Sequence, residues 1–102
     1  MNAPSFDEHV RRALDSLPRE VARALENVAV VIEEADPEEP ELFGLWQSHE
    51  FLPDKITIYR KPLLQAFSDP AELEEEIRVT VLHELAHYFG IDEGRLEELG
   101  YD

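Results

Sequence analysis

The chain has no cysteine, and its single methionine is Met1. No disulfide therefore stabilises the fold, and a zinc site would need nitrogen and oxygen ligands. Basic residues are also scarce, because nine Lys and Arg stand against 24 Asp and Glu, for a net charge of -15. This charge repels phosphate backbones and acidic membrane surfaces, so nucleic acids and membranes are not expected partners. A peptide or protein partner, in particular a basic one, is more compatible with it.

Long hydrophobic runs are absent too. No apolar run approaches the roughly 18 residues of a membrane span. The first ten residues, MNAPSFDEHV, have neither the basic start nor the apolar core of a secretory signal, so a cytoplasmic location is expected. At 102 residues, with no internal repeat and no linker, a single domain over residues 1–102 is expected.

Two short helices are predicted at the start of the chain. Ser5 and Glu8 fit a capping box, and apolar residues then recur at helical spacing. Pro18 suits the first turn of the second helix. His9 falls on the polar face of the first helix, and His49 lies in a loop, so both imidazoles are expected to be solvated.

Three segments predict strands. Residues 28–32 are rich in β-branched side chains and predict a buried strand, and residues 42–46 predict a short strand around Gly44. Residues 55–60 alternate between apolar and polar, which is typical of a strand with one buried and one more open face. Between the first two, residues 33–41 carry six acids and two prolines and predict a solvated loop.

A long helix follows with explicit boundaries. Asp69 can cap it, Pro70 fits its first position, Glu72 completes a capping box and Gly90 suits a left-handed stop. The result is about 20 residues, or about 30 Å. Its apolar stripe predicts a helix through the middle of an α+β domain. The stripe consists of Leu73, Ile77, Val81, Leu82, Leu85, Ala86 and Phe89.

The segment with the most specific chemistry is the HExxH motif at residues 83–87 of this helix. Residues four apart lie on one helix face, so His83 and His87 can reach a single zinc ion, with Glu84 beside it. The alternative is a pair of packed core histidines. Two imidazoles leave a catalytic zinc one protein ligand short. Gly90 can turn the chain so that Asp92 or Glu93 returns to the metal, and both residues qualify.

The segment HELAHYFGIDE, residues 83–93, resembles the HExxHxxGxx(H/D) signature of metzincins and Asp-zincins. Most of the chain is similar to the short bacterial zincin-like metallopeptidases that have a minimal zincin fold. The similarity lies in GLW at 44–46, LPDKITIYRKPLL at 52–64, VTVLHELAHYFGID at 79–92 and RLEELGY at 95–101.

This resemblance implies a minimal zincin-like fold, with a small sheet packed on a long central active-site helix. It also implies one zinc ion per chain. By position the third ligand falls on Glu93, where the family has Asp, and Asp92 is the alternative. The methionine turn of larger metzincins is absent.

The resemblance further implies that Glu84 is a general base that activates water for peptide hydrolysis. An extended substrate would lie beside an edge strand, for which residues Ile56, Thr57, Ile58 and Tyr59 are the expected candidates. Tyr59 and Tyr101 are candidates for oxyanion stabilisation, although packing explains each of them as well.

Two functions from different classes follow. The first is a zinc metallopeptidase, and the second is a non-catalytic protein that keeps the fold and binds zinc, a peptide or another partner. The small size of the chain leaves little room for specificity pockets, which favours the second. Glu84 favours the first, because a purely structural zinc site needs no base.

Overall fold

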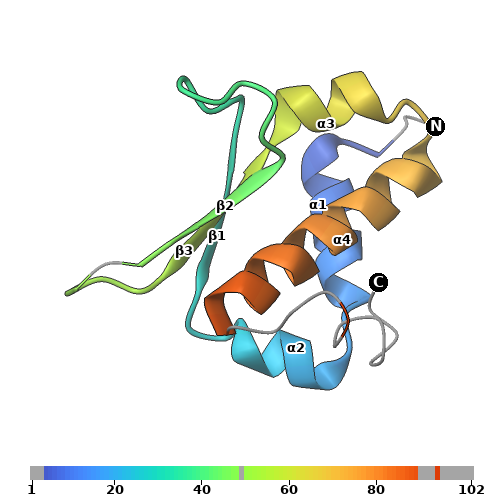
Figure 1. Cartoon of the computed structure of the whole chain (residues 1–102). Coiled ribbons are helices and arrows are strands. Elements are labelled where there is room, and N and C mark those ends of the chain that lie inside the picture. Colours follow the sequence, from blue (N-terminus) through green and yellow to red (C-terminus); the bar gives the residue numbers. More distant parts are fainter. Residues whose placement is uncertain (1–3, 49, 90–93, 95–102) are drawn as a thin grey trace.

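The computed structural model describes residues 4–48, 50–89 and 94 (Figure 1). The described part is an α+β fold in which the long helix α4 lies between a small sheet and the helix α1. The elements, in chain order, are α1 (Phe6–Asp15), α2 (Arg19–Ala24), β1 (Ala29–Glu33), β2 (Gly44–Gln47), β3 (Lys55–Tyr59), α3 (Arg60–Ala66) and α4 (Pro70–Phe89).

Helix α4 begins as the sequence predicts. Asp69 Oδ2 accepts a hydrogen bond from the backbone N–H of Glu72 at 3.0 Å, which satisfies one of the free amides of the first turn. The predicted stripe is buried from Leu73 to Ala86, and Ile77 and Val81 have no exposed surface. The expected stop at Gly90 and the expected short helix at residues 92–99 fall largely or wholly outside the described residues.

The sheet has the strand order β1-β3-β2. Strand β3 pairs in parallel with β1 and antiparallel with β2. Residues 28–32 were expected to form a buried strand, but β1 lies at an edge of the sheet, and its residues are half-buried or exposed. The buried strand is β3.

Strand β3 also differs from its expected half-open character. Thr57 is 1% exposed and Tyr59 is 5% exposed, so both faces of the strand are covered. The register explains this, because Thr57 lies between Val31 of β1 and Leu45 of β2. Side chains of both neighbouring strands cover the face that alternation alone assigns to solvent.

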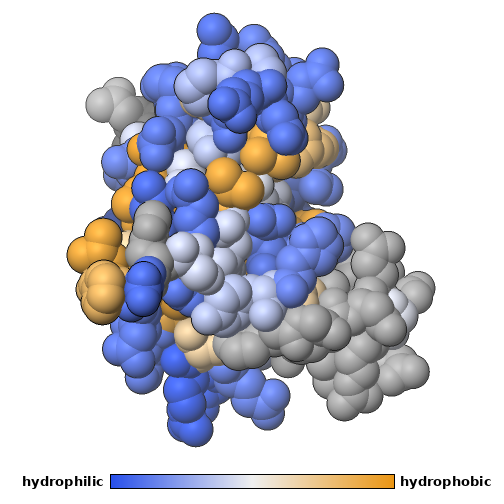
Figure 2. Space-filling model, turned by 60° about the vertical axis from the view of Figure 1, so that its left-hand side comes forward, coloured by the Kyte–Doolittle hydropathy of each residue, from blue (hydrophilic) through white to orange (hydrophobic). Residues whose placement is uncertain are grey.

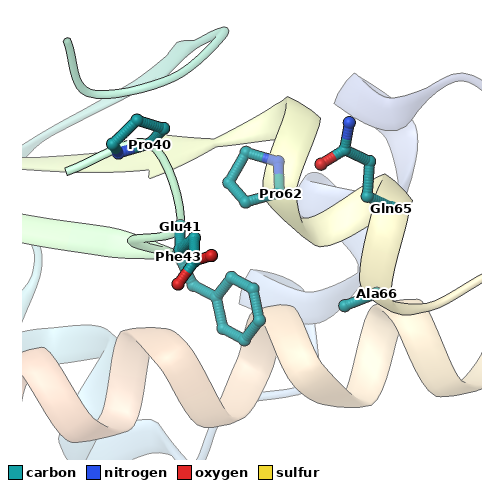
Figure 3. A pocket seen from close by; sticks show the side chains of 6 residues that line it. All are labelled: Pro40, Glu41, Phe43, Pro62, Gln65 and Ala66. Atoms are coloured by element: carbon teal, nitrogen blue, oxygen red, sulfur yellow. The ribbon is translucent and has the colours of Figure 1, made fainter.

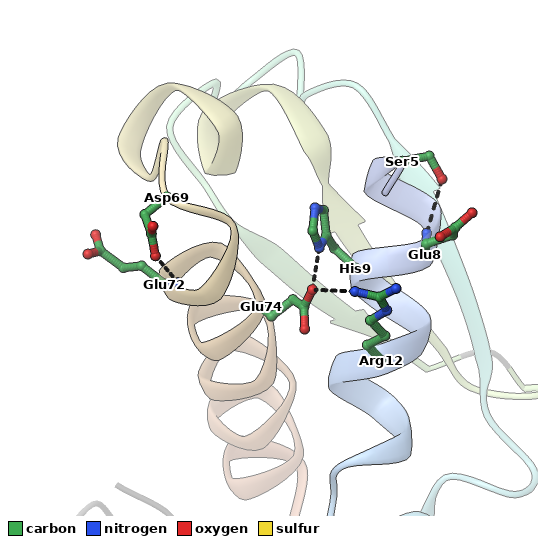
Figure 4. A network of polar contacts seen from close by, with 7 residues as sticks. All are labelled: Ser5, Glu8, His9, Arg12, Asp69, Glu72 and Glu74. Atoms are coloured by element: carbon green, nitrogen blue, oxygen red, sulfur yellow. Dashed lines mark hydrogen bonds and ion pairs between the residues drawn. The ribbon is translucent and has the colours of Figure 1, made fainter. Parts of the chain in front are cut away.

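Helix α1 packs on α4, and this packing overturns the expectation that His9 is solvated. His9 is 5% exposed, and its Nδ1 contacts Glu74 Oε2 of α4 (Figure 4). His9 follows Phe6 by three residues and precedes Ala13 by four, so it lies on the buried face of α1. A carboxylate partner offsets the cost of burying the imidazole there.

The acidic loop between β1 and β2 is tied to the sheet through Asp36. Its Oδ1 accepts a hydrogen bond from the backbone N–H of Glu38 at 2.8 Å, and its Oδ2 accepts one from the Tyr59 hydroxyl at 3.3 Å. Burial raises the pKa of Tyr59, and the neighbouring charge of Asp36 raises it further. The rest of the loop is mostly exposed, as its composition predicts.

The surface seen in Figure 2 is mostly hydrophilic, with hydrophobic residues in small patches. Exposed large hydrophobic side chains include Phe51 and Leu52, which lie between β2 and β3. Among the helices in the described part of the chain, none has the length and hydropathy of a membrane span.

Candidate active site

The last turns of α4 have one buried face and one face that is partly exposed. Leu85 and Ala86 are 7% and 2% exposed and belong to the buried face. His83 and Glu84 are half-buried, and His87 is exposed. Because the apolar residues occupy the inner face, the motif residues are left where a ligand can reach them.

The two imidazoles fit a zinc ion as donors. In a chain without cysteine, neutral imidazole is the nitrogen ligand that zinc uses. Among the described residues, neither His83 nor His87 has a hydrogen-bond or ion-pair partner, so their ring nitrogens are available.

The third ligand is expected at one of two acidic residues that follow α4 in the sequence. Asp92 and Glu93, together with the turn residue Gly90, lie outside the described residues. Within the residues that are described, no three His, Asp or Glu side chains come together as a metal site would need. Of the predicted zinc ligands, His83 and His87 lie within the described residues, and both are on α4.

Glu84 is fixed by a strand far away in the sequence. Its Oε1 accepts a hydrogen bond from the backbone N–H of Trp46 at 2.9 Å. Residue pairs in an antiparallel ladder alternate between hydrogen-bonded and non-hydrogen-bonded. Tyr59 donates its backbone N–H to the carbonyl of Phe43 at 2.9 Å, so the polar backbone groups of Gly44 and Trp46 point away from β3. The Glu84 carboxylate therefore lies at the outer edge of β2.

Gly44 allows β2 to approach α4 this closely. A Cβ atom added at Gly44 would stand 2.6 Å from Thr80 Cγ2 and 3.2 Å from the carbonyl oxygen of Thr57. Next to this contact is a hollow of about 280 Å³, lined in part by Gly44, Thr80, His83 and Glu84. A glycine is needed at this position because the space between β2 and α4 is too small for a Cβ atom.

Tyr88 is a site residue that sequence reasoning missed. Its ring stacks on Trp46, with ring centroids 4.6 Å apart and planes inclined by 21°. Hydrogen bonding with Asp54, and the charge of that carboxylate, raise the pKa of Tyr88. The available signal was its position four residues after Glu84, which places both side chains on the same helix face.

The segment expected to be the edge strand beside a substrate is not an edge strand. Residues Ile56, Thr57, Ile58 and Tyr59 belong to β3, whose two edges are already paired with β1 and β2. A central strand has no free backbone groups for an added peptide. The edge strand that contacts α4 is β2, at residues 44–47.

The residues before β2 also line hollows other than the one beside Glu84. A hollow of about 380 Å³ lies between this segment and α3, where Pro40 and Glu41 face Pro62 and Gln65 (Figure 3). Glu41 also lines the hollow that contains His83 and Glu84. This side of the candidate site therefore carries an additional negative charge.

Of the two tyrosines considered for oxyanion stabilisation, Tyr59 is buried at the end of β3 and donates its hydroxyl hydrogen to Asp36. These contacts agree with the alternative in which Tyr59 packs in the fold. Tyr101 lies outside the described residues.

Comparison with known proteins identifies a family that covers most of the chain. A family model described as zincin-like metallopeptidase matches residues 25–101, about three quarters of the chain. The match includes all strands of the described sheet, together with α4 and its HExxH motif. A search of curated proteins finds no match. The family implies zinc as the cofactor and peptides as the substrate class, and the chain belongs to the family of zincin-like metallopeptidases.

Proposed function

We propose that this chain hydrolyses peptide bonds, with one zinc ion bound by His83 and His87 and with Glu84 as the general base. Family membership supports the reaction class, and the two available imidazoles on α4 support the ligand assignment. Glu93 is the proposed third ligand, and Asp92 is the alternative. The zinc content of Glu93→Ala and Asp92→Ala distinguishes these two candidates. Loss of the true ligand should weaken zinc binding more.

When bound, zinc supplies Lewis-acid chemistry that polarises the scissile carbonyl and lets water lose a proton near neutral pH. Glu84 receives this proton and passes it to the leaving amine. Its Oε1 is held by the Trp46 backbone N–H, which leaves Oε2 to carry the proton. The backbone contact also fixes the orientation of the side chain before substrate arrives.

The observation that carries the proposal is the position of Glu84 at the open edge of β2. A peptide that adds to this edge as an extended strand would pass directly beside the carboxylate. The outward backbone groups of Gly44, together with the carbonyl of Trp46, are the pairing groups for such a peptide. A general base, a strand edge for the substrate and two metal-binding imidazoles then lie next to one another.

Glu84→Gln tests this mechanism. The amide keeps an oxygen that can accept the Trp46 hydrogen bond, so the fold and the bound zinc should be retained, whereas the base is lost. We expect cleavage of a peptide library by the zinc-loaded protein to fall by about 10²–10⁴-fold. Zinc content and thermal unfolding, measured on the same preparations, should remain near the wild-type values.

Glu75→Gln is the matched control, because Glu75 is exposed on the same helix. It should cleave like the wild type. Unchanged cleavage by Glu84→Gln would remove Glu84 from the mechanism. A zinc-loaded wild-type protein that cleaves no peptide in the library would favour the non-catalytic alternative.

A further inference from the structure

Glu41 is an acidic residue in the wall of the candidate active site that the proposed mechanism does not use. It lies three residues before the start of β2 and lines the hollow of about 280 Å³ that also contains His83 and Glu84. Figure 3 shows its side chain beside that of Phe43, which lines the same hollow. Glu41 is exposed, so a ligand in the hollow can reach its carboxylate.

The backbone around Glu41 is held on both sides. Leu42 donates its backbone N–H to the carbonyl three residues earlier at 3.0 Å, which closes a turn with Pro40 at its second position. Proline at this position of a turn has its φ angle fixed by the ring. The Phe43 carbonyl then accepts the backbone N–H of Tyr59 at 2.9 Å. The fold therefore fixes where the side chain of Glu41 begins.

The carboxylate of Glu41 has no cationic partner within the described part of the chain. Arg60 and Arg78 pair with other glutamates, and Glu41 makes no hydrogen bond or ion pair with a described residue. Neither Lys nor Arg is among the described residues that line the hollow beside Glu84 or the hollow of about 380 Å³. A cationic group of a ligand therefore has no competitor there.

The charges of the proposed zinc site leave Glu41 in excess. The two positive charges of the ion would be balanced by Glu84 and by the carboxylate ligand proposed at Glu93 or Asp92, and metal-bound imidazoles are neutral. Glu41 then makes the hollow negative, and the six acids of residues 33–41 strengthen this potential. A negative hollow attracts cations.

The wall next to Glu41 is apolar. Leu42 and Phe43 line the hollow and are half-buried. Lys and Arg combine an apolar stem with a charged end, so the stem can pack on these two residues while the end pairs with Glu41. Side chains on one face of an extended peptide are about 7 Å apart, and a hollow of about 280 Å³ is roughly 8 Å across, so it holds one of them.

We propose that the hollow beside Glu84 selects peptide substrates that carry a Lys or Arg side chain, and that this side chain pairs with Glu41. The inference rests on the proposed function, because it takes the bound peptide to be the substrate of the same site. Glu41 lies at most about 11 Å of chain from Gly44, so the basic residue lies within about two positions of the peptide residue opposite Gly44.

The test compares two mixtures of octapeptides. Each peptide of the first mixture has one Arg among random neutral residues, and the second mixture has citrulline in place of Arg, which keeps the shape without the charge. Cleavage by the zinc-loaded wild type is measured by mass spectrometry. We expect the Arg mixture to be cleaved roughly fivefold faster, at a constant distance from the Arg, as the upper end for an exposed ion pair allows.

The variants follow the ratio of the two cleavage rates. Glu41→Gln should bring the ratio to about one, and Glu41→Lys should bring it below one because the lysine repels Arg. Glu38→Gln is the matched control, since Glu38 belongs to the same acidic segment but does not line this hollow. It should keep the wild-type ratio. Added salt should lower the ratio of the wild type and leave that of Glu41→Gln unchanged.

Retention of the same mixtures on immobilised, zinc-loaded Glu84→Gln separates this inference from the peptidase proposal. Preferential retention of the Arg mixture, without cleavage of either mixture by the wild type, supports the pairing with Glu41 and overturns the peptidase activity. Cleavage of both mixtures at equal rates overturns the pairing and leaves the peptidase activity standing, as does an equal change of the ratio in Glu41→Gln and Glu38→Gln. Neither cleavage nor retention overturns both.

Discussion

The two halves of α4 differ in what surrounds them. In the first half, Glu74 contacts His9 of α1, and Leu73 and Ile77 are buried. In the second half, the inner face remains buried, but the outer face carries His83, Glu84 and the exposed Tyr88 beside β2. One helix therefore supplies both a segment that is anchored to α1 and a segment that carries the motif residues beside β2.

The difference shows how a small domain holds reactive groups in place. Both halves belong to one helix, and the helical hydrogen bonds fix the backbone of the second half relative to the first. Glu84 then needs only one further contact, the backbone N–H of Trp46, to be oriented. Substitutions in the first half should therefore reduce stability, and those on the outer face of the second half should reduce activity.

The largest expected effect comes from Ile77→Ala, in the anchored half. Ile77 has no exposed surface, and its truncation leaves a cavity between α4 and its neighbours. We expect a loss of about 2–5 kcal/mol in the free energy of unfolding, measured by urea denaturation. Glu84→Gln should change the same quantity by less than about 1 kcal/mol. Similar losses in the free energy of unfolding for both variants would show that the two halves of α4 contribute equally to stability.

A smaller effect is expected for Gly44→Ala, which acts where the second half meets β2. The new Cβ collides with Thr80 Cγ2, so strand and helix must separate, at a cost of about 1–3 kcal/mol and with reduced cleavage as Glu84 shifts. Adding Thr80→Ser removes this methyl group but keeps the hydroxyl that donates to the Glu76 carbonyl. The double variant should recover part of both losses, since the tight contact that remains is the one with the Thr57 carbonyl. Absence of any recovery would mean that the steric contact is not the cause.

The smallest effect concerns Tyr59, in the central strand, at alkaline pH. Its folded-state pKa is raised by burial and by Asp36, so above the unfolded-state pKa of about 10 the fold keeps a proton that the unfolded chain releases. The contribution of neutral Tyr59 to stability is complete below about pH 10 and is lost as the pH rises through the folded-state pKa. Thermal unfolding of wild type and Tyr59→Phe should therefore differ by a constant amount up to about pH 10 and converge or cross above it. A pH-independent difference would contradict this.

The features predicted correctly from sequence are mostly local. The cap at Asp69, the proline at the first position and the apolar stripe together define the start and the buried face of α4, because each depends on neighbouring residues. The family is also correct, because the HExxH motif and the blocks around it lie within the matched region. The cap at Ser5 is confirmed by its hydrogen bond with the Glu8 backbone N–H at 3.2 Å.

The features that sequence reasoning missed depend on long-range pairing. Strand order decides which strand is central, and alternation within residues 55–60 contains no information about it. His9 is buried where α1 packs on α4 and contacts Glu74, 65 positions away, and Glu84 is oriented by Trp46, 38 positions away. The metal ligands, the single domain over residues 1–102 and the cytoplasmic location stay predictions.

The hydrogen bond between Glu84 and Trp46 has a further consequence for solubility. An open sheet edge is a template for pairing with other chains, and proteins commonly protect such edges with charged side chains. Glu84 places a carboxylate on an outward backbone N–H of β2, which occupies one pairing position and adds a negative charge there. The proposed catalytic base therefore also blocks one position at which another chain could pair with this edge, and an apolar residue at this position would remove both functions at once.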